Sequence, residues 1–159
     1  MSFSIRQAIK TDMSRVLELI VELAVFEKEP DAVKVTVKDL EKGGFEVPKQ
    51  FVCFVAECDG IIEGIALVYN RFSTWKGSVL HLEDLVISQK QRGSGMGTAL
   101  LNEVVKYGYS LGVRRVSWEV LDWNTPAIKF YEKKGADVKR DWYVVHMNEK
   151  AIENYLENI

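Results

Sequence analysis

A chain of 159 residues with 47% hydrophobic and 28% charged side chains is long enough for one domain with a substantial apolar core. Its formal charge of −2 argues against a nucleic-acid-binding protein, which usually carries a basic patch or a high isoelectric point. No apolar stretch reaches the length of a signal peptide or a transmembrane helix, so we expect a protein that spans no membrane.

The two cysteines, Cys53 and Cys58, indicate a reducing compartment. Five residues apart on one expected strand, they would lie roughly 16 Å from each other, which is far beyond the reach of a disulfide. We therefore expect a cytoplasmic protein.

The N-terminal part of the chain predicts a strand and a helix. Residues 3–8 alternate between apolar and polar side chains, as a half-buried strand does. Thr11 is a candidate N-cap for a helix over about residues 12–27. The apolar face expected for that helix consists of Val16, Leu19, Ile20, Leu23 and Phe26.

Three carboxylates gather where this helix must end. Pro30 prevents its continuation, and Glu27, Glu29 and Asp31 surround that proline. The cluster is either a solvated loop or a rim that attracts a cation. Further on, Thr36 is a candidate cap for a second, short helix that is expected to stop at residues 43–44, both glycine.

The middle of the chain predicts a hairpin followed by a central strand. Residues 51–58 and 61–72 are joined by Asp59-Gly60, a strong two-residue turn signal. After a turn over 73–77, residues 79–87 form an apolar run interrupted by Glu83 and Asp84. Carboxylates are costly to bury in such a strand, so this pair lies at a rim or serves a function.

A glycine-rich turn at 92–97 separates that strand from a helix expected over 97–111. Gly93, Gly95 and Gly97 let the backbone approach a ligand closely, and the first amides of the helix favour an anion. No lysine follows as a P-loop requires, and the third glycine is one position early for the dinucleotide fingerprint. The turn therefore indicates another kind of pyrophosphate site.

The C-terminal part continues the mixed pattern. After Gly112, residues 113–121 predict a strand, and Asn124 is a plausible cap for a helix over about 125–134, with Pro126 in its first turn. Gly135 would end that helix. Residues 141–148 predict a last strand and 149–157 a short helix. The order of elements is that of an α/β protein with a mixed sheet, and we expect one domain over 1–159.

Two other kinds of chemistry have no support in the sequence. His81 and His146 are too few and too far apart for a familiar zinc pattern, and no Cys-His motif accompanies them, so we expect no metal. No G-x-S-x-G motif is present, which leaves no sign of a serine acyl-enzyme.

The turn from Arg92 to Gly97 matches the acyl-CoA-binding pattern [QR]-x-x-G-x-[GA] of the GNAT acetyltransferases. The segments HLEDLVI before it, VLDWN at 120–124 and AIKFYEKKGA at 127–136 resemble the same family in the expected order. ELAVFEKE, the FSTW…LED spacing and VLDWN further resemble its spermidine/spermine and thialysine acetyltransferase branch.

The resemblance implies a single-domain GNAT fold, with a mixed sheet of about six to seven strands, about four flanking helices, and two central strands that splay to admit the pantetheine arm. It also implies acetyl-CoA as cosubstrate, a small-molecule amine as acceptor, and a homodimer. The residues expected to bind the cosubstrate are Leu85, Val86, Ile87, Arg92, Gly93, Ser94, Gly95, Met96, Gly97, Thr98, Asn124, Ala127, Phe130, Tyr131 and Lys133. The residues expected to bind the acceptor are Glu27, Trp75, Glu83, Asp84 and Trp142.

An alkylamine acceptor needs a base, because with a pKa near ~10.4 it is mostly ammonium at neutral pH, and deprotonation costs roughly 4–5 kcal/mol. The family resemblance assigns this role to Glu83 and the role of acid toward the leaving thiolate to Tyr131. Without the motif, Tyr131 would be read as a packing residue and Asn124 as a simple helix cap. Because neighbouring strand residues face opposite ways, Glu83 and Asp84 should not line one pocket unless the strand is distorted.

The acceptor is the least determined feature. The polyamine branch has an acidic residue two positions before the tryptophan of its turn, and Ser73 occupies that position here. The loop at 137–142 contains Lys139 and Arg140, and Arg140 could receive a carboxylate. We therefore expect a short aminoalkyl substrate, thialysine-like or a small diamine, over spermine. A protein N-terminus or lysine, and a non-catalytic CoA-sensing module, are the alternatives.

Overall fold

Five strands form a single mixed sheet in which their order in space follows their order in the chain. The structure is a computed structural model that describes residues 2–159. The strands from β1 to β4 pair in antiparallel fashion, and β5 joins β4 in parallel. Their bounds are β1 (Ser4–Gln7), β2 (Val52–Cys58), β3 (Ile61–Ser73), β4 (Gly77–Ile87) and β5 (Val116–Ser117).

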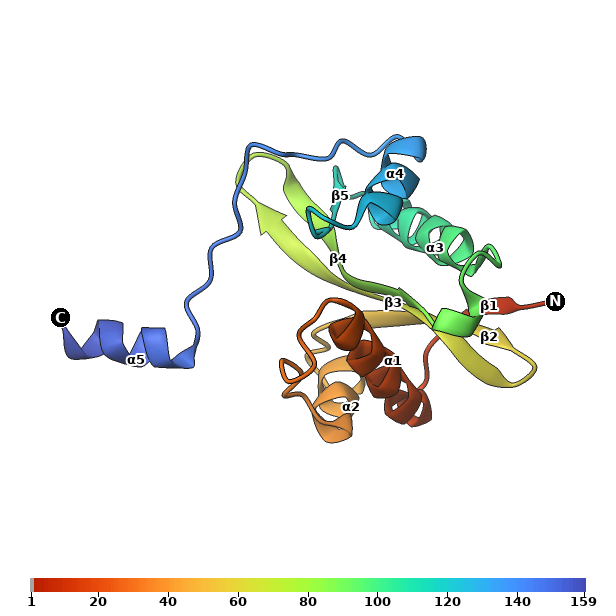
Figure 1. Cartoon of the computed structure of the whole chain (residues 1–159), viewed down its shortest axis with the longest axis horizontal. Helices are drawn as coiled ribbons and strands as arrows, with labels where there is room; N and C mark the ends of the chain where they lie inside the picture. The colour runs from red at the N-terminus through yellow and green to blue at the C-terminus, as the bar shows by residue number, and fades with distance from the viewer. Residues whose placement is uncertain (1) are drawn as a thin grey trace. The chain divides into compact units, whose positions relative to one another are not determined.

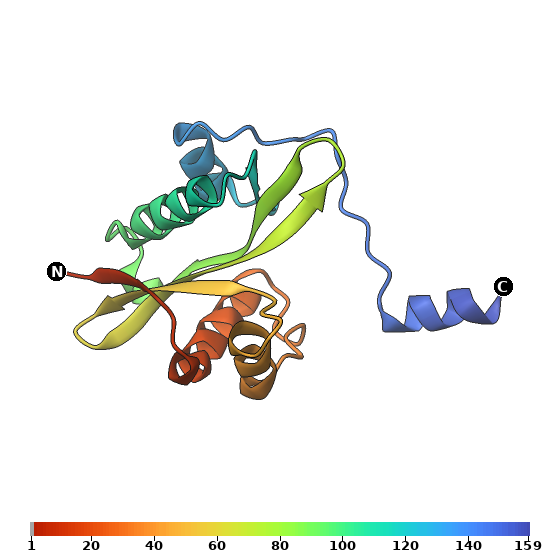
Figure 2. The ribbon, with the colours of Figure 1, turned by 180° about the vertical axis from the view of Figure 1, so that it is seen from behind.

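The chain divides into two compact units, Met1–Glu119 and Val120–Ile159, and the sheet belongs to the first. In that unit, α1 (Met13–Phe26) and α2 (Val37–Phe45) cover one face of the sheet, and α3 (Met96–Ser110) covers the other (Figures 1 and 2). No helix within residues 2–159 is long and apolar enough to cross a membrane.

The apolar periodicity of α1 and α3 accounts for the core. The largest fully buried side chains on these helices and on the sheet between them are Met13, Val16, Leu19, Val55, Ile65, Val68, Val79, Leu80, Leu82, Met96, Leu100 and Val104. The expected apolar face of α1 is confirmed at Val16 and Leu19, with Ile20 and Leu23 packed against the core. Phe26 was also placed on that face, but its side chain lies at the helix end and is 37% exposed.

The hairpin through Asp59-Gly60 is confirmed, with positive φ at both turn residues, as a tight two-residue turn of this kind requires. The strand count of six to seven is wrong, since the described residues contain five. Residues 113–121 contribute only the two-residue β5, and 141–148 form no strand. A pattern of β-branched and aromatic residues measures fit to a sheet, but a strand also needs a neighbouring edge with which to pair.

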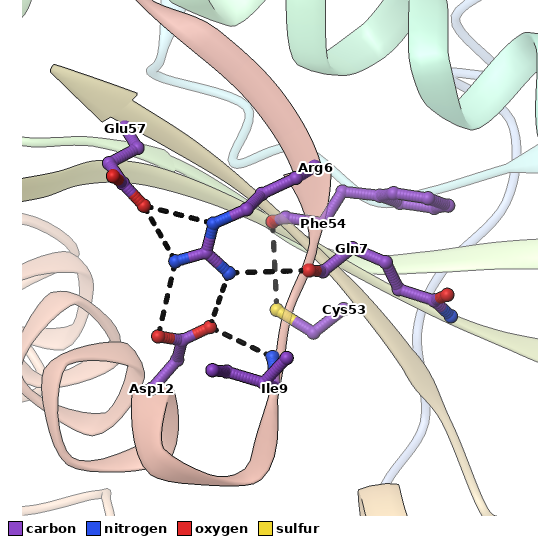
Figure 3. A network of polar contacts seen from close by, with 7 residues as sticks. All are labelled: Arg6, Gln7, Ile9, Asp12, Cys53, Phe54 and Glu57. Atoms are coloured by element: carbon purple, nitrogen blue, oxygen red, sulfur yellow. Dashed lines mark hydrogen bonds and ion pairs between the residues drawn. The ribbon is translucent and has the colours of Figure 1, made fainter. Parts of the chain in front are cut away.

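The start of α1 differs from the prediction of Thr11 as its N-cap. Lys10–Asp12 form a 3₁₀ turn, η1, and α1 begins at Met13 with Asp12 at the N-cap position. The Asp12 carboxylate accepts hydrogen bonds from the Ile9 amide at 2.8 Å and from Arg6 Nη1 at 2.7 Å (Figure 3). Arg6 Nη2 also pairs with Glu57 at 2.6 Å. One guanidinium thus joins β1, β2 and the start of α1.

The start of α2 follows local rules, but its end does not. Thr36 forms the expected capping box, in which its hydroxyl accepts from the Asp39 amide at 3.3 Å and its amide donates to the Asp39 carboxylate at 2.8 Å. Gly43 and Gly44 do not stop the helix, which continues to Phe45. They are buried beneath Phe51, whose ring would lie 2.9 and 2.8 Å from an added Cβ. Both glycines therefore serve close packing.

The second unit contains α4 (Thr125–Lys133) and α5 (Glu149–Glu157). Both helices begin as an asparagine cap predicts, because Asn124 and Asn148 accept hydrogen bonds from the amides of Ala127 and Ala151. Gly135, with a φ of +87°, follows α4. With α5 included, residues 2–159 contain five α-helices where about four were expected.

We expect Asp12→Asn to lower the free energy of unfolding at pH 7 by about 1–2 kcal/mol, because it weakens charge-assisted hydrogen bonds. Burial raises the pKa of Asp12, but the hydrogen bonds from Arg6 and the Ile9 amide lower it by more, so the net shift is downward. A carboxyl with a lowered pKa stabilises the fold above its unfolded pKa of ~3.9 and loses that contribution as the pH falls through its folded pKa.

Urea denaturation of both proteins between pH 7 and pH 2 measures this effect, and the difference between them should narrow toward pH 2. Asp31→Asn, at an exposed aspartate in the loop after α1, is the matched control and should change little. If Asp12→Asn lowers the free energy of unfolding by the same amount at every pH, the prediction is contradicted.

Candidate active site

A β-bulge in β4 places Glu83 outside the regular ladder. Leu67 of β3 faces Asp84, and the next β3 residue, Val68, faces Leu82, so Glu83 has no partner on β3. The buried run of residues 79–82 ends there, and the Glu83 side chain is 53% exposed. Regular alternation would send Glu83 and Asp84 to opposite faces, and the bulge is the distortion that relaxes this constraint.

Three predicted acceptor-binding carboxylates influence one another within the first unit. The pKa of Asp84 is raised to about 6, first by burial and then by the negative charges of Glu83 and Glu27. Glu27 lies at the C-terminal end of α1, and partial desolvation raises its pKa as well. Carboxylates at the bulge of β4 and at the end of α1 therefore both add negative charge around Asp84, and we call these three carboxylates the acidic group.

Two residues that the sequence did not single out for this site contact Glu83. Burial and then the charge of the Glu83 carboxylate raise the pKa of Tyr69 on β3, so the two side chains interact. His81 Nε2 lies 3.6 Å from Glu83 Oε2, and burial lowers the pKa of His81. The i, i+2 spacing of His81 and Glu83 was a visible signal, but the register that brings Tyr69 to the same place was not.

The edge of β4 that faces β5 is paired over two residues only. Leu80 pairs with Val116 and His81 with Ser117, and no strand continues this pairing in the described part of the chain. On the β3 side, the predicted cosubstrate residues Leu85, Val86 and Ile87 pair with Ala66, Ile65 and Gly64. The other edge of β4 after His81 is thus left without a β5 partner.

The glycine turn leads from η2 (Gln89–Gln91) into α3. Gly93 and Gly95 have φ values of +81° and +91°, and Gly95 is the N-cap of α3. Gly97 lies within the helix, and a Cβ there would be in ordinary contact with Ile87 at 3.7 Å. The first amides of α3 have no acceptors within the helix, and its dipole favours an anion at this end. The remaining predicted residues of the turn are Arg92, Ser94, Met96 and Thr98.

Side chains of α1 and β3 hold the segment before this turn. Glu63 of β3, which is 3% exposed, accepts a hydrogen bond from the Ser88 hydroxyl at 2.7 Å and pairs with Lys90 Nζ at 2.6 Å. Glu22 of α1 accepts from the Gln89 amide at 2.7 Å. The Arg92 guanidinium lies 4.8 Å from the centre of the Phe26 ring. The turn is therefore attached to rigid elements, and the charge of Lys90 is already paired.

The other predicted cosubstrate residues belong to the second unit, on α4 or at its cap. The Asn124 side chain accepts from the Ala127 amide at 3.4 Å, so both residues take part in the cap. Tyr131 lies beside Phe130, with ring centres 5.3 Å apart, and burial raises the pKa of its phenol. Lys133 is exposed in the last turn.

The predicted acceptor residues outside the acidic group are exposed aromatics. Trp75 lies in the β3–β4 turn and is 80% exposed, and Trp142 is 70% exposed. Ser73 accepts hydrogen bonds from the Trp75 and Lys76 amides, each at 3.2 Å, and so caps this turn. Arg140 pairs with Glu132 at 2.8 Å. Among residues 2–159, no three His, Cys, Asp or Glu side chains are grouped as a metal site requires.

Residues 13–136 match the model of the Acetyltransferase (GNAT) family. The chain is 34% identical over 140 residues to a thialysine N-epsilon-acetyltransferase of Bos taurus, covering 83% of this chain and 82% of that protein. It is 29% identical over 160 residues to a spermidine/spermine N(1)-acetyltransferase-like protein 1 of Homo sapiens, covering 94% of this chain and 23% of that protein.

The structure of an integron cassette protein from the mobile metagenome of V. cholerae superposes with a TM-score of 0.80 at 20% identity, covering 99% of each chain. This likeness concerns the fold, whereas the family match and the sequence relatives concern descent. The chain therefore belongs to the GNAT family and is an acetyl-CoA-dependent N-acetyltransferase of its thialysine and spermidine/spermine branch.

Proposed function

We propose that the chain transfers the acetyl group of acetyl-CoA to the primary amine of a small aminoalkyl substrate by direct attack. The observation that carries this proposal is the bulge at Glu83, which presents a half-exposed carboxylate beside Asp84 at the open edge of β4. An ammonium substrate requires negative charge to bind it and a base to deprotonate it, and this acidic group supplies both.

In the proposed reaction Glu83 accepts the proton that the ammonium loses, directly or through one water. The amine nitrogen then forms a bond to the thioester carbonyl carbon, and the carbon–sulfur bond breaks. Tyr131 gives its phenolic proton to the departing sulfur, and the second proton that the attacking nitrogen loses as it becomes an amide restores the phenol, directly or through water. Because burial raises the pKa of Tyr131, the phenol stays protonated at neutral pH until a thiolate develops. Asp84 and Glu27 attract the ammonium and orient it.

We propose that the turn at 92–98 binds the cosubstrate pyrophosphate through backbone amides. The support is a left-handed glycine at the N-cap of a 15-residue helix, and a loop held by Glu22 and Glu63. The unpaired edge of β4 at residues 85–87 would receive the amide groups of the pantetheine arm. On α4 we assign cosubstrate contacts to Asn124, Ala127, Phe130, Tyr131 and Lys133.

Gly95→Ala should raise the KM for acetyl-CoA at least tenfold, because a φ of +91° is strained for alanine and the amides beside it would turn away from the phosphates. Steady-state kinetics with acetyl-CoA varied measures this effect. Gly60→Ala is the matched control, since Gly60 has a φ of +77° and equal open space but lies in the β2–β3 turn. Equal effects of both variants on KM would contradict the assignment.

Glu83→Gln and Tyr131→Phe should each lower kcat by ~10²–10⁴-fold, the usual contribution of a general acid or base, with the Kd of CoA nearly unchanged. Glu83→Gln should recover part of its activity at high pH, where free amine is abundant, whereas Tyr131→Phe should not. A pH–rate profile with Glu83→Gln and Tyr131→Phe, and calorimetric titration with CoA, measure these effects.

The matched controls are Glu46→Gln and Tyr109→Phe, two exposed positions outside the proposed site. A pH–rate profile that keeps its shape in Glu83→Gln would remove Glu83 as the base.

We propose a short acceptor, thialysine-like or a small diamine. Ser73 is committed to capping the β3–β4 turn and provides no charge for the second ammonium of a long polyamine. Arg140, whose salt bridge with Glu132 is exposed, could exchange that partner for an acceptor carboxylate. The similarity to thialysine acetyltransferases supports this choice. The family resemblance assigns Trp75 and Trp142 to acceptor binding, and each is an exposed aromatic side chain that would contact an alkyl chain.

We expect kcat/KM to be highest for thialysine or putrescine, intermediate for lysine and lowest for spermine, because the charged groups assigned to the site are few and close together. A thiol-release assay over these amines, with a lysine peptide and a no-acceptor control, measures the order. For the preferred amine, kcat/KM should fall as pH drops through about 6, where Asp84 becomes protonated, and Asp84→Asn should remove that step.

A preference for spermine would contradict the argument from Ser73. Turnover of peptides alone would point to a protein acceptor, and tight CoA binding without turnover of any acceptor would point to a CoA-sensing module. The homodimer that the family resemblance implies also remains a proposal. It is supported by the exposed apolar side chains of Tyr143, Val145 and Met147, which a second copy could cover.

A further inference from the structure

A row of three side chains crosses the sheet beside the proposed base. Tyr69 of β3 and His81 of β4 are antiparallel register partners, and His81 and Ser117 of β5 are parallel partners. The Tyr69 and His81 rings lie 5.1 Å apart, and His81 Nδ1 lies 3.3 Å from the Ser117 hydroxyl. The ladder of hydrogen bonds thus holds a phenol, an imidazole and a hydroxyl side by side.

Both rings of this row reach the Glu83 carboxylate. Tyr69, the register partner of His81, interacts with it closely enough that burial and then the charge of Glu83 raise the pKa of the phenol, and His81 Nε2 approaches Glu83 Oε2 to 3.6 Å. Glu83 is the bulged residue and has no cross-strand partner on β3, so the regular ladder does not determine where its side chain points. A half-exposed carboxylate on a bulge would otherwise sample several rotamers, and these contacts restrict them.

The protonation state of His81 determines whether the negative charge of Glu83 has a positive partner. Its side chain is 8% exposed, and this burial lowers its pKa, so the imidazole is neutral at pH 7. The groups that act on it from the adjacent elements are Tyr69 and Arg71 of β3, Glu83 of β4, and Glu119 after β5. A neutral ring leaves the negative charge of Glu83 uncompensated, whereas an imidazolium would form an ion pair with it and weaken it as a base.

We propose that Tyr69 and His81 are positioning residues that hold the Glu83 carboxylate in the orientation that receives the proton of the amine. The inference rests on the proposed function, in which Glu83 is the base. In this arrangement the Ser117 hydroxyl donates to His81 Nδ1, and the single ring proton sits on Nε2, facing Glu83. Tyr69 and His81 keep their own protons throughout. The proton taken from the amine leaves Glu83 directly to solvent, to which that side chain is open.

Tyr69→Phe and His81→Leu should each lower kcat about tenfold, the size expected when a polar interaction with a charged group is lost, and leave the KM for acetyl-CoA nearly unchanged. His81→Gln, which keeps an N–H near the position of Nε2, should restore part of the loss. A purely structural role would lower thermal stability together with kcat and would not be rescued by glutamine.

His146→Gln and Tyr109→Phe are matched controls, since both residues are exposed and lie outside the proposed site. Thermal unfolding of each variant separates lost activity from lost fold. If His81→Leu does not fold, Tyr69→Phe still tests the proposal, because it removes one oxygen atom and keeps the ring.

Double variants with Glu83→Gln test whether Tyr69 and His81 act through Glu83. If Tyr69 and His81 act through Glu83, then Tyr69→Phe and His81→Gln should change kcat less than twofold in a Glu83→Gln background. Full additivity would overturn the positioning role. If Glu83→Gln lowers kcat strongly and Tyr69→Phe does not change it, this inference is refuted and the proposed function stands. If Glu83→Gln leaves kcat unchanged, the assignment of Glu83 as the base is refuted.

Discussion

The bulge at Glu83 is the constraint on which the rest of the proposed site depends. β3 and β4 form the longest ladder of the sheet, and this ladder changes register by one residue between Leu82 and Asp84. The extra residue turns a buried strand into one that presents a carboxylate to solvent and brings a second, Asp84, under the influence of the first and of Glu27. The bulge leaves Glu83 half-exposed, whereas Asp84 stays largely buried, and burial is the first cause of its raised pKa.

The same two strands also organise the segment that leads to the cosubstrate turn. Beyond the bulge the ladder returns to regular pairing and ends at Gly64 and Ile87. Immediately after it, the Ser88 amide donates to the Glu63 carbonyl at 2.8 Å, and the buried Glu63 carboxylate holds Ser88 and Lys90. The proposed base lies on β4, and the proposed pyrophosphate turn begins after η2, which follows β4 directly, so backbone geometry limits the distance between them. Each end has its own polar anchor, Tyr69 and His81 at Glu83, and Glu63 at the turn.

Helix ends show where local and distant interactions compete. Thr36, Asn124 and Asn148 cap their helices because the capping contact lies within three residues and nothing distant interferes. Thr11 does not, because Arg6 and the Ile9 amide hold Asp12 in a 3₁₀ turn and delay the helix to Met13. Gly43 and Gly44 look like the end of a helix, but both are glycine because the Phe51 ring packs over them and leaves no room for a Cβ.

By itself the sequence determined the features that depend on neighbouring residues: the hairpin turn, three helix caps, the periodic faces of α1 and α3, and the glycine turn whose motif indicates the family. Tertiary structure alone decided the features that depend on a distant partner. Segment 141–148 has strand composition but pairs with no strand, β5 pairs over two residues, and Tyr69 meets Glu83 only through the register of β3 on β4. The physical reason is that side-chain pattern specifies which face a residue prefers, whereas register and pairing require a second strand whose position the local sequence does not contain.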